Sequence, residues 1–380
     1  MPNFSLSKQF SLSDIESALH QVLASPGNDL LAGKEFASKR HGPLRDAARL
    51  QLLATWARHA PGRRLIFNAQ NLTQVLLDKW CDYAPGLVAI RMSGGVVIGN
   101  EQISRRDALR QASSKIASTE LLEFDDVVKG RSLDFPCIAG AKSQYLSALF
   151  TEKSPFAVKG KQEMLATLEQ LNSYVARTDA TRIEASFWDA CALFATELMK
   201  NTQEHATSDA EGEPYAAHAE GLIIGWKEMS DRIFGVDFQS HASLREFWER
   251  EQVSFGQGDT GLRSIQMSFF DTGPGFVGRL TGKRVKVLDL EEEREIVLKG
   301  LRKHATSKRE TGAGNGIPEV LEKLRQVGGL ITIRTGRLRL FRAFAPGEDV
   351  ELFAFEDWSP DELGEMAGSV VSILLPIRRP

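Results

Sequence analysis

The sequence predicts an α/β protein with two domains, a small α/β domain over residues 1–155 and an α+β sandwich over residues 156–380. The 380 residues are enough for two domains, and 42% hydrophobic with 26% charged residues is typical of a globular chain. Helical and strand-like segments are interspersed in the first part. In the second part, two long helical segments precede short strand-like segments joined by short turns. This order favours a mixed or antiparallel sheet covered by helices on one face.

The charge and cysteine content exclude several classes of protein. The chain has 47 basic and 50 acidic residues, a net charge of -3, so no overall positive field attracts nucleic acid or an anionic membrane. Its 3 cysteines have no C-x-x-C spacing, which argues against a disulfide framework or a cysteine zinc site. No secretory signal and no run of about 18 apolar residues occurs. We therefore expect a cytoplasmic protein without a membrane span.

The first domain is expected to alternate helices with short strands. Ser13 and Glu16 have the spacing of a capping box that opens a helix ending near residue 23, and residues 45–60 carry apolar side chains at helical spacing. Further elements follow in chain order: strands at 63–68, 87–93 and 96–100, and helices near 70–82 and 104–118. Arg105, Arg106 and Arg110 give one helix a basic face, for which contact with nucleic acid is possible but not favoured over a solvated surface.

The second domain is expected to begin with two helices, over residues 160–176 and 182–206. Strands and a further helix follow: strands at 220–228, 231–238, 264–271, 330–335, 338–345, 350–356 and 369–376, and a helix at 317–327. Arg337 and Arg339 alternate with leucines, the pattern of a strand with one face in water. Residues 240–261 read as an insertion between strands and are interpreted as a partner surface.

The helix expected over residues 182–206 presents two different faces. An apolar stripe predicts that one face is buried against the sheet: Phe187, Cys191, Phe194 and Leu198. Glu197, Asn201 and His205 stand at i, i+4 and i+8 on a neighbouring face. A carboxylate beside a carboxamide at the edge of a buried stripe favours a polar ligand or a metal. The alternative is that all three side chains point into solvent.

A second candidate site lies at the end of an apolar strand. Asp271 is followed by Gly273 and Gly275, so its carboxylate could meet a ligand at close range. The pattern alone is weak, because an Asp-x-Gly-x-Gly string is often only a turn. Read from Gly273, it also satisfies the G-x-G-x-x-G string of dinucleotide-binding proteins. That interpretation is disfavoured because Pro274 fits the phosphate turn poorly and no apolar helical period follows.

A third candidate is a glycine-rich loop before a helix. Gly312, Gly314 and Gly316 alternate directly before a helix whose first turn contains Pro318, a residue suited to that position. Such a loop presents free N–H groups and the positive end of the helix dipole, which together favour phosphate. Lys308 could reach the same phosphates, although a solvated lysine explains it equally well.

Taken in order, these segments resemble the motifs of the Bergerat-fold (GHKL) ATPases, the superfamily of gyrase B subunits, ninety-kilodalton heat-shock chaperones, MutL and sensor histidine kinases. The stretch ELMKNTQEHA resembles the N box, DTGPG the first glycine box and GAGNG the second. GSVVSILLP at residues 368–376 resembles the closing strand. The resemblance covers about residues 160–377 and does not extend to the first 155.

The resemblance implies an ATP site with Mg²⁺. Asn201 would help to hold the ion against the triphosphate, and Asp271 would accept a hydrogen bond from the adenine amino group. Gly275 would let the base approach, and Ser369 would support the adenine contact. Glu197 matches the carboxylate that orients and deprotonates water in the hydrolysing members. Because a carboxylate is mismatched to a keto oxygen, adenine is expected over guanine.

The same resemblance implies that Gly312, Gly314 and Gly316 wrap the phosphates within a mobile lid. Asn315 departs from the apolar residue that many relatives carry there, and an element typical of the MutL branch is missing. We expect slow ATP hydrolysis, with lid closure acting as a switch toward a protein partner docked through the first domain. The alternatives are a protein kinase of the histidine-kinase or anti-sigma serine-kinase type, and a non-catalytic module gated by ATP.

Overall fold

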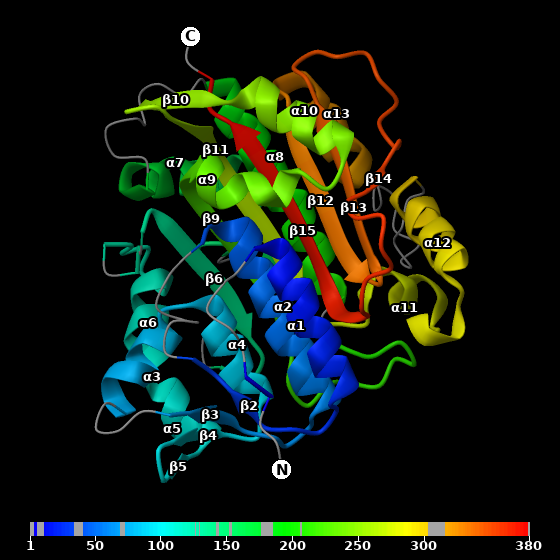
Figure 1. Cartoon of the computed structure of the whole chain (residues 1–380). Helices are drawn as coiled ribbons and strands as arrows, with labels where there is room; N and C mark the ends of the chain where they lie inside the picture. The colour runs from blue at the N-terminus through cyan, green and yellow to red at the C-terminus, as the bar shows by residue number, and fades with distance from the viewer. Residues whose placement is uncertain are drawn as a thin grey trace.

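The computed structural model describes residues 4–5, 11–33, 41–68, 73–125, 127–128, 130–141, 144–151, 154–175, 185–205, 207–302 and 316–378. Its main feature is an 8-stranded antiparallel sheet (Figure 1). Seven strands form the path of that sheet in the order β14 (Glu356–Asp357), β13 (Leu338–Phe344), β12 (Gly329–Gly336), β15 (Met366–Pro376), β11 (Asp259–Asp271), β9 (Ala219–Ser230) and β6 (Ser132–Ile138). The eighth, β10 (Val253–Gly256), pairs with β11.

The other described strands form two smaller sheets. A 5-stranded sheet is formed in chain order by β1 (Phe4–Ser5), β2 (Leu30–Leu31), β3 (Leu65–Phe67), β4 (Val96–Ile98) and β5 (Glu101–Ile103). Its first four strands are parallel, and β5 is antiparallel to β4. β7 (Phe150–Thr151) pairs with β8 (Ser154–Val158) as a separate 2-stranded sheet. The small sheet agrees with an α/β unit in the first part of the chain.

The helices belong to two groups along the chain. Those before residue 156 are α1 (Leu12–Ala24), α2 (Pro43–His59), α3 (Thr73–Cys81), α4 (Ala84–Met92), α5 (Arg105–Leu109) and α6 (Ser113–Glu120). Those after it are α7 (Lys161–Val175), α8 (Ala185–His205), α9 (Asp231–Phe234), α10 (Ala242–Glu251), α11 (Gly275–Thr281), α12 (Leu290–Arg302) and α13 (Gly316–Val327). Among the described residues, no helix is long and apolar enough to cross a membrane.

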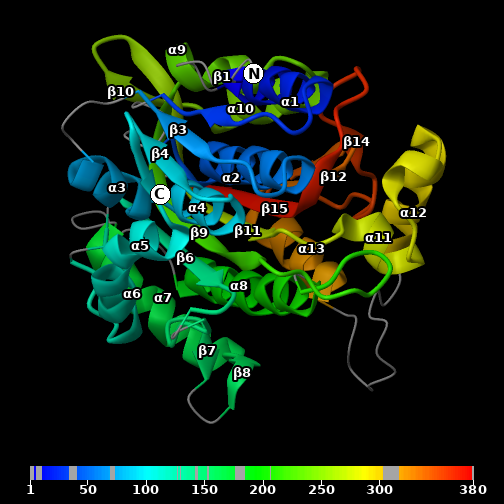
Figure 2. The ribbon, with the colours of Figure 1, turned by 90° about the horizontal axis from the view of Figure 1, so that it is seen from below.

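Helices cover both faces of the large sheet, which differs from the expectation of helices on one face. α7, α8 and α13 pack on the face that carries Phe269 and Ile333. α1, α2, α4 and α10 pack on the other face, which carries Ile223 and Leu330. Figure 2 shows α2 on one side of β15 and α8 with α13 on the other. Burial on both faces explains why almost every residue of β9 and β11 is buried.

Polar side chains of β11 lie on the second face, beneath the N-terminal helices. Ser264, Gln266 and Ser268 alternate along β11, yet all three are buried. Gln266 Oε1 accepts a hydrogen bond from the Leu44 N–H at 3.3 Å, and the Ser268 hydroxyl is 2.7 Å from that of Ser372. These polar groups are therefore satisfied beneath the N-terminal helices rather than by solvent.

The core is continuous across the boundary expected near residue 155. β6, which precedes that boundary, pairs with β9 from Ser132 to Ile138 and forms an edge of the large sheet. Side chains of α2 share one hydrophobic cluster with Val370 and Leu374 of β15. The first part of the chain is thus packed directly on the sheet of the second part.

Local differences from the sequence expectations have physical reasons. The capping box of α1 is formed by Ser11 and Asp14, not by Ser13 and Glu16. Residues 87–93, expected as a strand, lie mostly in α4, which is apolar because it is buried on nearly all sides. Residues 231–238 form α9 and a 3₁₀ turn rather than a strand. Within the range expected as a strand at 350–356, only the last residue joins β14.

The insertion over residues 240–261 packs one side of a helix into the core and leaves its other side exposed. It forms α10 and β10, and Phe247 and Trp248 of α10 are buried. The Trp248 ring lies 4.7 Å from that of Phe238, centroid to centroid, and the Trp358 ring lies 5.6 Å from it. The opposite face of α10 and the turn between β10 and β11 are exposed, so the partner surface on this segment stays a prediction.

Candidate functional site

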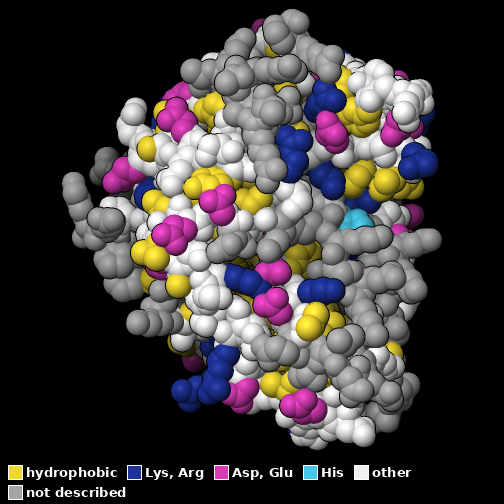
Figure 3. Space-filling view, turned by 90° about the vertical axis from the view of Figure 1, so that its left-hand side faces the viewer, with side chains coloured by type: hydrophobic (Ala, Val, Ile, Leu, Met, Phe, Trp, Pro, Cys, Tyr) yellow, Lys and Arg dark blue, Asp and Glu magenta, His cyan; other side chains and the backbone are white. Residues whose placement is uncertain are grey.

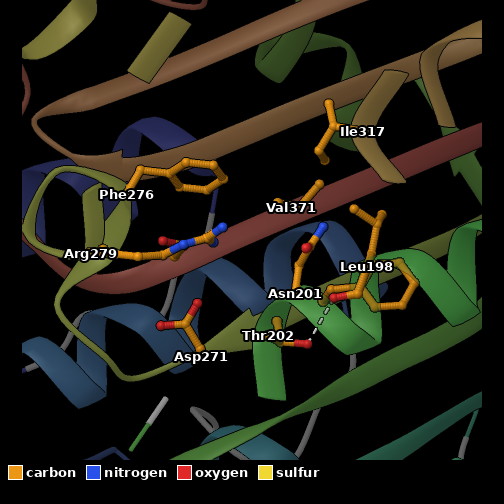
Figure 4. Close-up of a pocket in the computed structure, with 11 residues that line it drawn as sticks. Leu198, Asn201, Thr202, Asp271, Phe276, Arg279, Ile317 and Val371 are labelled. Atoms are coloured by element: carbon orange, nitrogen blue, oxygen red, sulfur yellow. Dashed lines mark hydrogen bonds between the residues drawn. The ribbon is translucent and has the colours of Figure 1, made fainter. Parts of the chain in front are cut away.

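A narrow pocket lies between the C-terminal part of α8, the end of β11, the start of α11 and β15 (Figure 4). The described residues that line it are Leu198, Asn201, Thr202, Phe269, Asp271, Gly275, Phe276, Arg279, Ile317, Ser369 and Val371. The cavity volume is only about 20 Å³. That is room for about one water. Phe276 and Arg279 both point into this space.

Asp271 sits where β11 ends, between two neighbouring strands. It pairs with Ser369 of β15 on one side and with Glu220 of β9 on the other. Its Oδ1 accepts a hydrogen bond from the Gly273 N–H at 2.8 Å. Burial raises the pKa of Asp271 to about 7, although that hydrogen bond and the charge of Arg279 act to lower it. The carboxyl group is thus oriented and can change protonation state near neutral pH.

Two glycines allow the backbone to pack closely around Asp271. Gly275 has a φ of 72°, and a Cβ atom there would lie 2.8 Å from Thr335 Oγ1. Gly368 has a φ of 68°, and a Cβ atom there would collide with the carbonyl oxygen of Asp271. A side chain at either position would be strained as well as crowded. The Gly368 N–H donates to the Gly273 carbonyl at 2.9 Å, which ties β15 to the turn after β11.

The C-terminal part of α8 supplies the polar residues on the opposite wall. The predicted apolar stripe is present, with Cys191, Phe194 and Leu198 almost fully buried. Asn201 is half-buried and points into the pocket. The Glu197 side chain is 22% exposed, and its Oε1 lies 3.0 Å from Lys200 Nζ. Glu197 is thus near the pocket but does not line it.

The described beginning of α13 lies against Glu197. A Cβ atom placed on Gly316 would come within 2.8 Å of Glu197 Oε2. Ile317, the next residue, lines the pocket. The segment that follows the glycine-rich loop therefore approaches the same end of α8 that carries Asn201.

The structure brings some of the predicted site residues together in one pocket. Asn201, Asp271, Gly275 and Ser369 line one pocket. Gly273 does not line it, but holds the Asp271 carboxylate. Glu197 and Gly316 lie against each other beside the pocket. Lys308, Gly312 and Gly314, together with the side chain of His205, lie outside the part of the chain that the structure describes.

Three residues in or beside the pocket had no signal in the sequence analysis. Thr335 lies near the end of β12 and beside the pocket, where its Oγ1 accepts a hydrogen bond from the Phe276 N–H at 3.0 Å and lies 3.3 Å from Ser369 Oγ. Phe276 and Arg279 project from α11, one turn apart, with the guanidinium carbon 5.5 Å from the ring centroid. Only the position of α11 directly after the first glycine pair could have indicated them.

Glu220 is a second buried carboxyl group beside the pocket. It is fully buried, and neither of its side-chain oxygens has a hydrogen-bond partner among the described residues. Burial raises the pKa of Glu220 to about 8, and the charge of Asp271 adds to the shift. The two carboxyl groups face the same side of the sheet, because they are directly opposed residues of an antiparallel pair. They therefore titrate as a coupled pair.

α2 supports the site from the other face of the sheet. Gln51 Nε2 donates to the Arg334 carbonyl at 3.1 Å and to the Ala367 carbonyl at 3.3 Å. The Ala367 N–H donates to Thr55 Oγ1 at 2.9 Å. Arg58 Nη2 donates to the Thr272 carbonyl at 2.9 Å. One helix thus fixes the main chain on both sides of Asp271.

The residues present fit a purine and a phosphate-bound cation by their chemistry. Asp271 offers an acceptor for an exocyclic amine, and Asn201 offers a neutral amide oxygen of the kind that Mg²⁺ accepts beside phosphates. Among the described residues, no group of three or more His, Cys, Asp or Glu side chains could hold a metal ion. A cation here would therefore take most of its ligands from its anion and from water. Comparisons with family models, curated proteins and solved structures found no match to this chain.

Proposed function

We propose that this chain binds Mg-ATP through a Bergerat-type domain over residues 156–380 and hydrolyses it slowly. The observation that carries the proposal is the meeting of Asn201, Asp271 and Ser369 in one pocket, from three separate elements. Gly275 and Gly368 let the backbone pack closely around Asp271. The resemblance of these segments to ATPase motifs supports the same conclusion.

The purine would occupy the Asp271 end of the pocket. There the ionised carboxylate would accept a hydrogen bond from the exocyclic amine, while Ser369 and Thr335 lie beside it. The pocket as described is too narrow for a purine, so the Phe276 and Arg279 side chains would have to turn away on binding. Arg279, once displaced from Asp271, would remain a cation at the pocket mouth.

The phosphates would lie toward Asn201 and the start of α13. Mg²⁺, when bound, would neutralise the phosphate oxygens, and Asn201 would help to hold it. Glu197 lies beside Gly316 and is partly open to solvent, so it could hold a water molecule and accept its proton. Its Oε1 lies 3.0 Å from Lys200 Nζ, which holds the side chain at this end of α8.

Calorimetric titration should show ATP binding that depends on Mg²⁺ and is much stronger than GTP binding. Affinity for ATP should rise with pH through about 7, because the amine needs the ionised form of Asp271. The Asp271→Asn variant should bind ATP roughly 10- to 100-fold more weakly at pH 8 and lose this pH dependence.

The matched control is Asp259→Asn, an exposed position at the other end of β11. It should bind ATP like the unmodified chain. Equal affinity for ATP and GTP, or an Asp271→Asn variant that binds normally, would contradict the assignment of the purine to this pocket.

Replacing Glu197 with alanine should abolish phosphate release while ATP binding stays within about threefold, since Glu197 lies beside the pocket rather than in it. Phosphate release and ATP affinity should be measured on the same preparation. The Lys200→Ala variant, which removes only the ion-pair partner, is the control and should retain release.

The destination of the phosphate separates hydrolysis from the two alternatives. Transfer of labelled γ-phosphate to a co-purified protein, lost in Asn201→Ala, would identify a kinase. Phosphate release that is unchanged in Glu197→Ala would show that Glu197 is not the base. ATP binding without release or transfer in the unmodified chain would leave a nucleotide-gated binding module.

A further inference from the structure

A large open groove lies in the N-terminal part of the protein, apart from the pocket at Asp271. Its volume is about 850 Å³. α5 and α6 form one wall, α4 forms the other, and the chain after β6 forms the floor. Figure 3 views the side of the molecule that carries α3 and α6, and in its lower part hydrophobic, basic and acidic side chains lie close together.

The inside of the groove is apolar and aliphatic. The apolar lining residues are Leu87, Leu109, Ala112, Ile116, Ala117, Leu121, Ile138, Ala139 and Ala141. Leu121 is 68% exposed, which is unusual for a leucine of this size on a protein surface. None of the described residues that line the groove is aromatic. The groove therefore offers contact to an aliphatic chain but no stacking surface for a nucleobase.

Four arginines and a single acidic residue line the same groove. Arg105, Arg106 and Arg110 are exposed on α5 and directly after it, and Arg91 of α4 is half-buried. Arg110 pairs with the exposed Asp107 at 3.3 Å, a contact worth little in water. Among the described residues, Arg106 forms no ion pair. The groove is thus locally basic in a chain whose net charge is -3.

The arginines are crowded rather than dispersed. Arg91 Nε donates to the Ala139 carbonyl at 2.9 Å, which fixes its guanidinium group at the floor. Arg105 Nη1 approaches the Arg91 carbonyl at 3.5 Å. Burial, and then the charge of Arg105, lower the pKa of Arg91. An anion bound between these side chains would relieve the repulsion, with the bidentate geometry that guanidinium groups give to carboxylate and phosphate.

We propose that this groove is a binding site for a single-chain anionic amphiphile, with its carboxylate or phosphate head between Arg91, Arg105 and Arg106 and its aliphatic chain along the apolar floor. The volume lies within the range of about 300 to 1,000 Å³ that is typical of small-molecule sites. Charge complementarity selects an anion, and the aliphatic lining selects a hydrocarbon chain. The site does not depend on the function proposed for the pocket at Asp271.

The test is calorimetric titration of the full chain with dodecyl phosphate below its critical micelle concentration. We expect saturable binding of one molecule per chain. Two control ligands should each bind at least tenfold more weakly than dodecyl phosphate. Inorganic phosphate has the anionic head without the chain, and dodecyltrimethylammonium has the same chain with a cationic head. Dodecanoate should bind comparably, because a carboxylate can replace the phosphate.

Two variants separate the polar and apolar parts of the site. Arg105→Glu combined with Arg106→Glu should weaken dodecyl phosphate binding at least tenfold, and because both side chains are exposed the fold should be retained. Ala117→Trp, which fills the groove from an exposed position on α6, should abolish binding. The control Arg232→Glu, an exposed arginine on α9, should bind normally.

The source of the amphiphile is distinguished by co-sedimentation with phosphatidylcholine vesicles that contain phosphatidic acid. If the unmodified chain sediments with these vesicles and the double arginine variant does not, the source is a membrane lipid. If the unmodified chain binds dodecyl phosphate in calorimetry but does not sediment with the vesicles, the source is a free amphiphile. Equal binding of dodecyltrimethylammonium, unchanged binding in the double variant, or binding only of an acidic amphipathic peptide would overturn the proposal.

Discussion

Replacing Glu16 with glutamine should lower the free energy of unfolding by about 3 to 5 kcal/mol, the cost typical of removing one member of a buried ion pair. Glu16 Oε1 lies 2.9 Å from Arg334 Nε, and it also accepts from Arg339 Nη2 at 2.9 Å. Both arginines are buried on the large sheet. Glutamine would leave two buried cations without the carboxylate that they share.

Chemical denaturation at pH 7 would measure the effect, and its dependence on pH would test the cause. Burial acts to raise the pKa of Glu16, but Arg334 and Arg339 outweigh it and hold the pKa below its ordinary value. The stabilisation is therefore complete above the ordinary pKa of 4.5 and is lost as pH falls through the lowered value. The difference between variant and unmodified chain should shrink in that acidic range.

The exposed pair between Glu295 and Lys299 provides the control. Its two side chains are 57% and 69% exposed, so Glu295→Gln should change the free energy of unfolding by less than about 0.5 kcal/mol. A Glu16→Gln variant as stable as the control would show that α1 is held to the sheet by its apolar side chains alone.

Replacing Glu220 with glutamine should stabilise the protein, in contrast to Glu16→Gln. The free energy of unfolding should rise by about 3 kcal/mol at pH 8. The unmodified carboxyl group is buried without a hydrogen-bond partner and next to Asp271. Glutamine has nearly the same shape and carries no charge at any pH. It therefore removes the cost of ionising a group in this position.

The pH dependence follows from the raised pKa of Glu220, about 8 in the folded protein against 4.5 in the unfolded chain. Between these values the folded state holds more protons, so stability falls as pH rises. The advantage of Glu220→Gln should be near zero at pH 4.5 and should grow up to pH 8. The variant should also lower the pKa of Asp271, since one neighbouring negative charge is lost.

Unfolding curves at pH 4.5, 6 and 8 would measure both effects. Glu228→Gln on the same strand is the control, because its side chain is 47% exposed and should contribute less than about 0.5 kcal/mol. If Glu220→Gln were destabilising at pH 8, the carboxyl group would have to be ionised and held by a partner that the geometry does not contain.

The elements that could be predicted from sequence are those with a long, clear pattern. α8 and β11 end at or near the expected residues. The apolar stripe defines α8, and the glycines after Asp271 mark the end of β11. α4 was predicted as a strand because a short apolar run cannot be told from a fully buried helix by periodicity. Pro85 in the first turn of α4 was the available signal for a helix.

Contacts between distant segments account for most of the other differences. The alternation of Arg337 and Arg339 with leucines correctly predicts a strand. The side of that strand expected to face water is instead covered at Arg339, whose guanidinium group pairs with Glu16 of α1. Asp271 and Ser369, which line the pocket, carry motif signals, whereas Thr335 beside it does not. Its place beside Ser369 depends on the register between β12 and β15, which no local pattern encodes.

The hydrogen bonds from α2 to the main chain around Asp271 have a consequence for signalling. Gln51, Thr55 and Arg58 touch the backbone where the base would sit, and none of them lines the pocket. In the ATP site that we propose, a partner that shifts this helix would change how firmly the nucleotide is held. Regulation from the N-terminal side would then act on the occupancy of the proposed site.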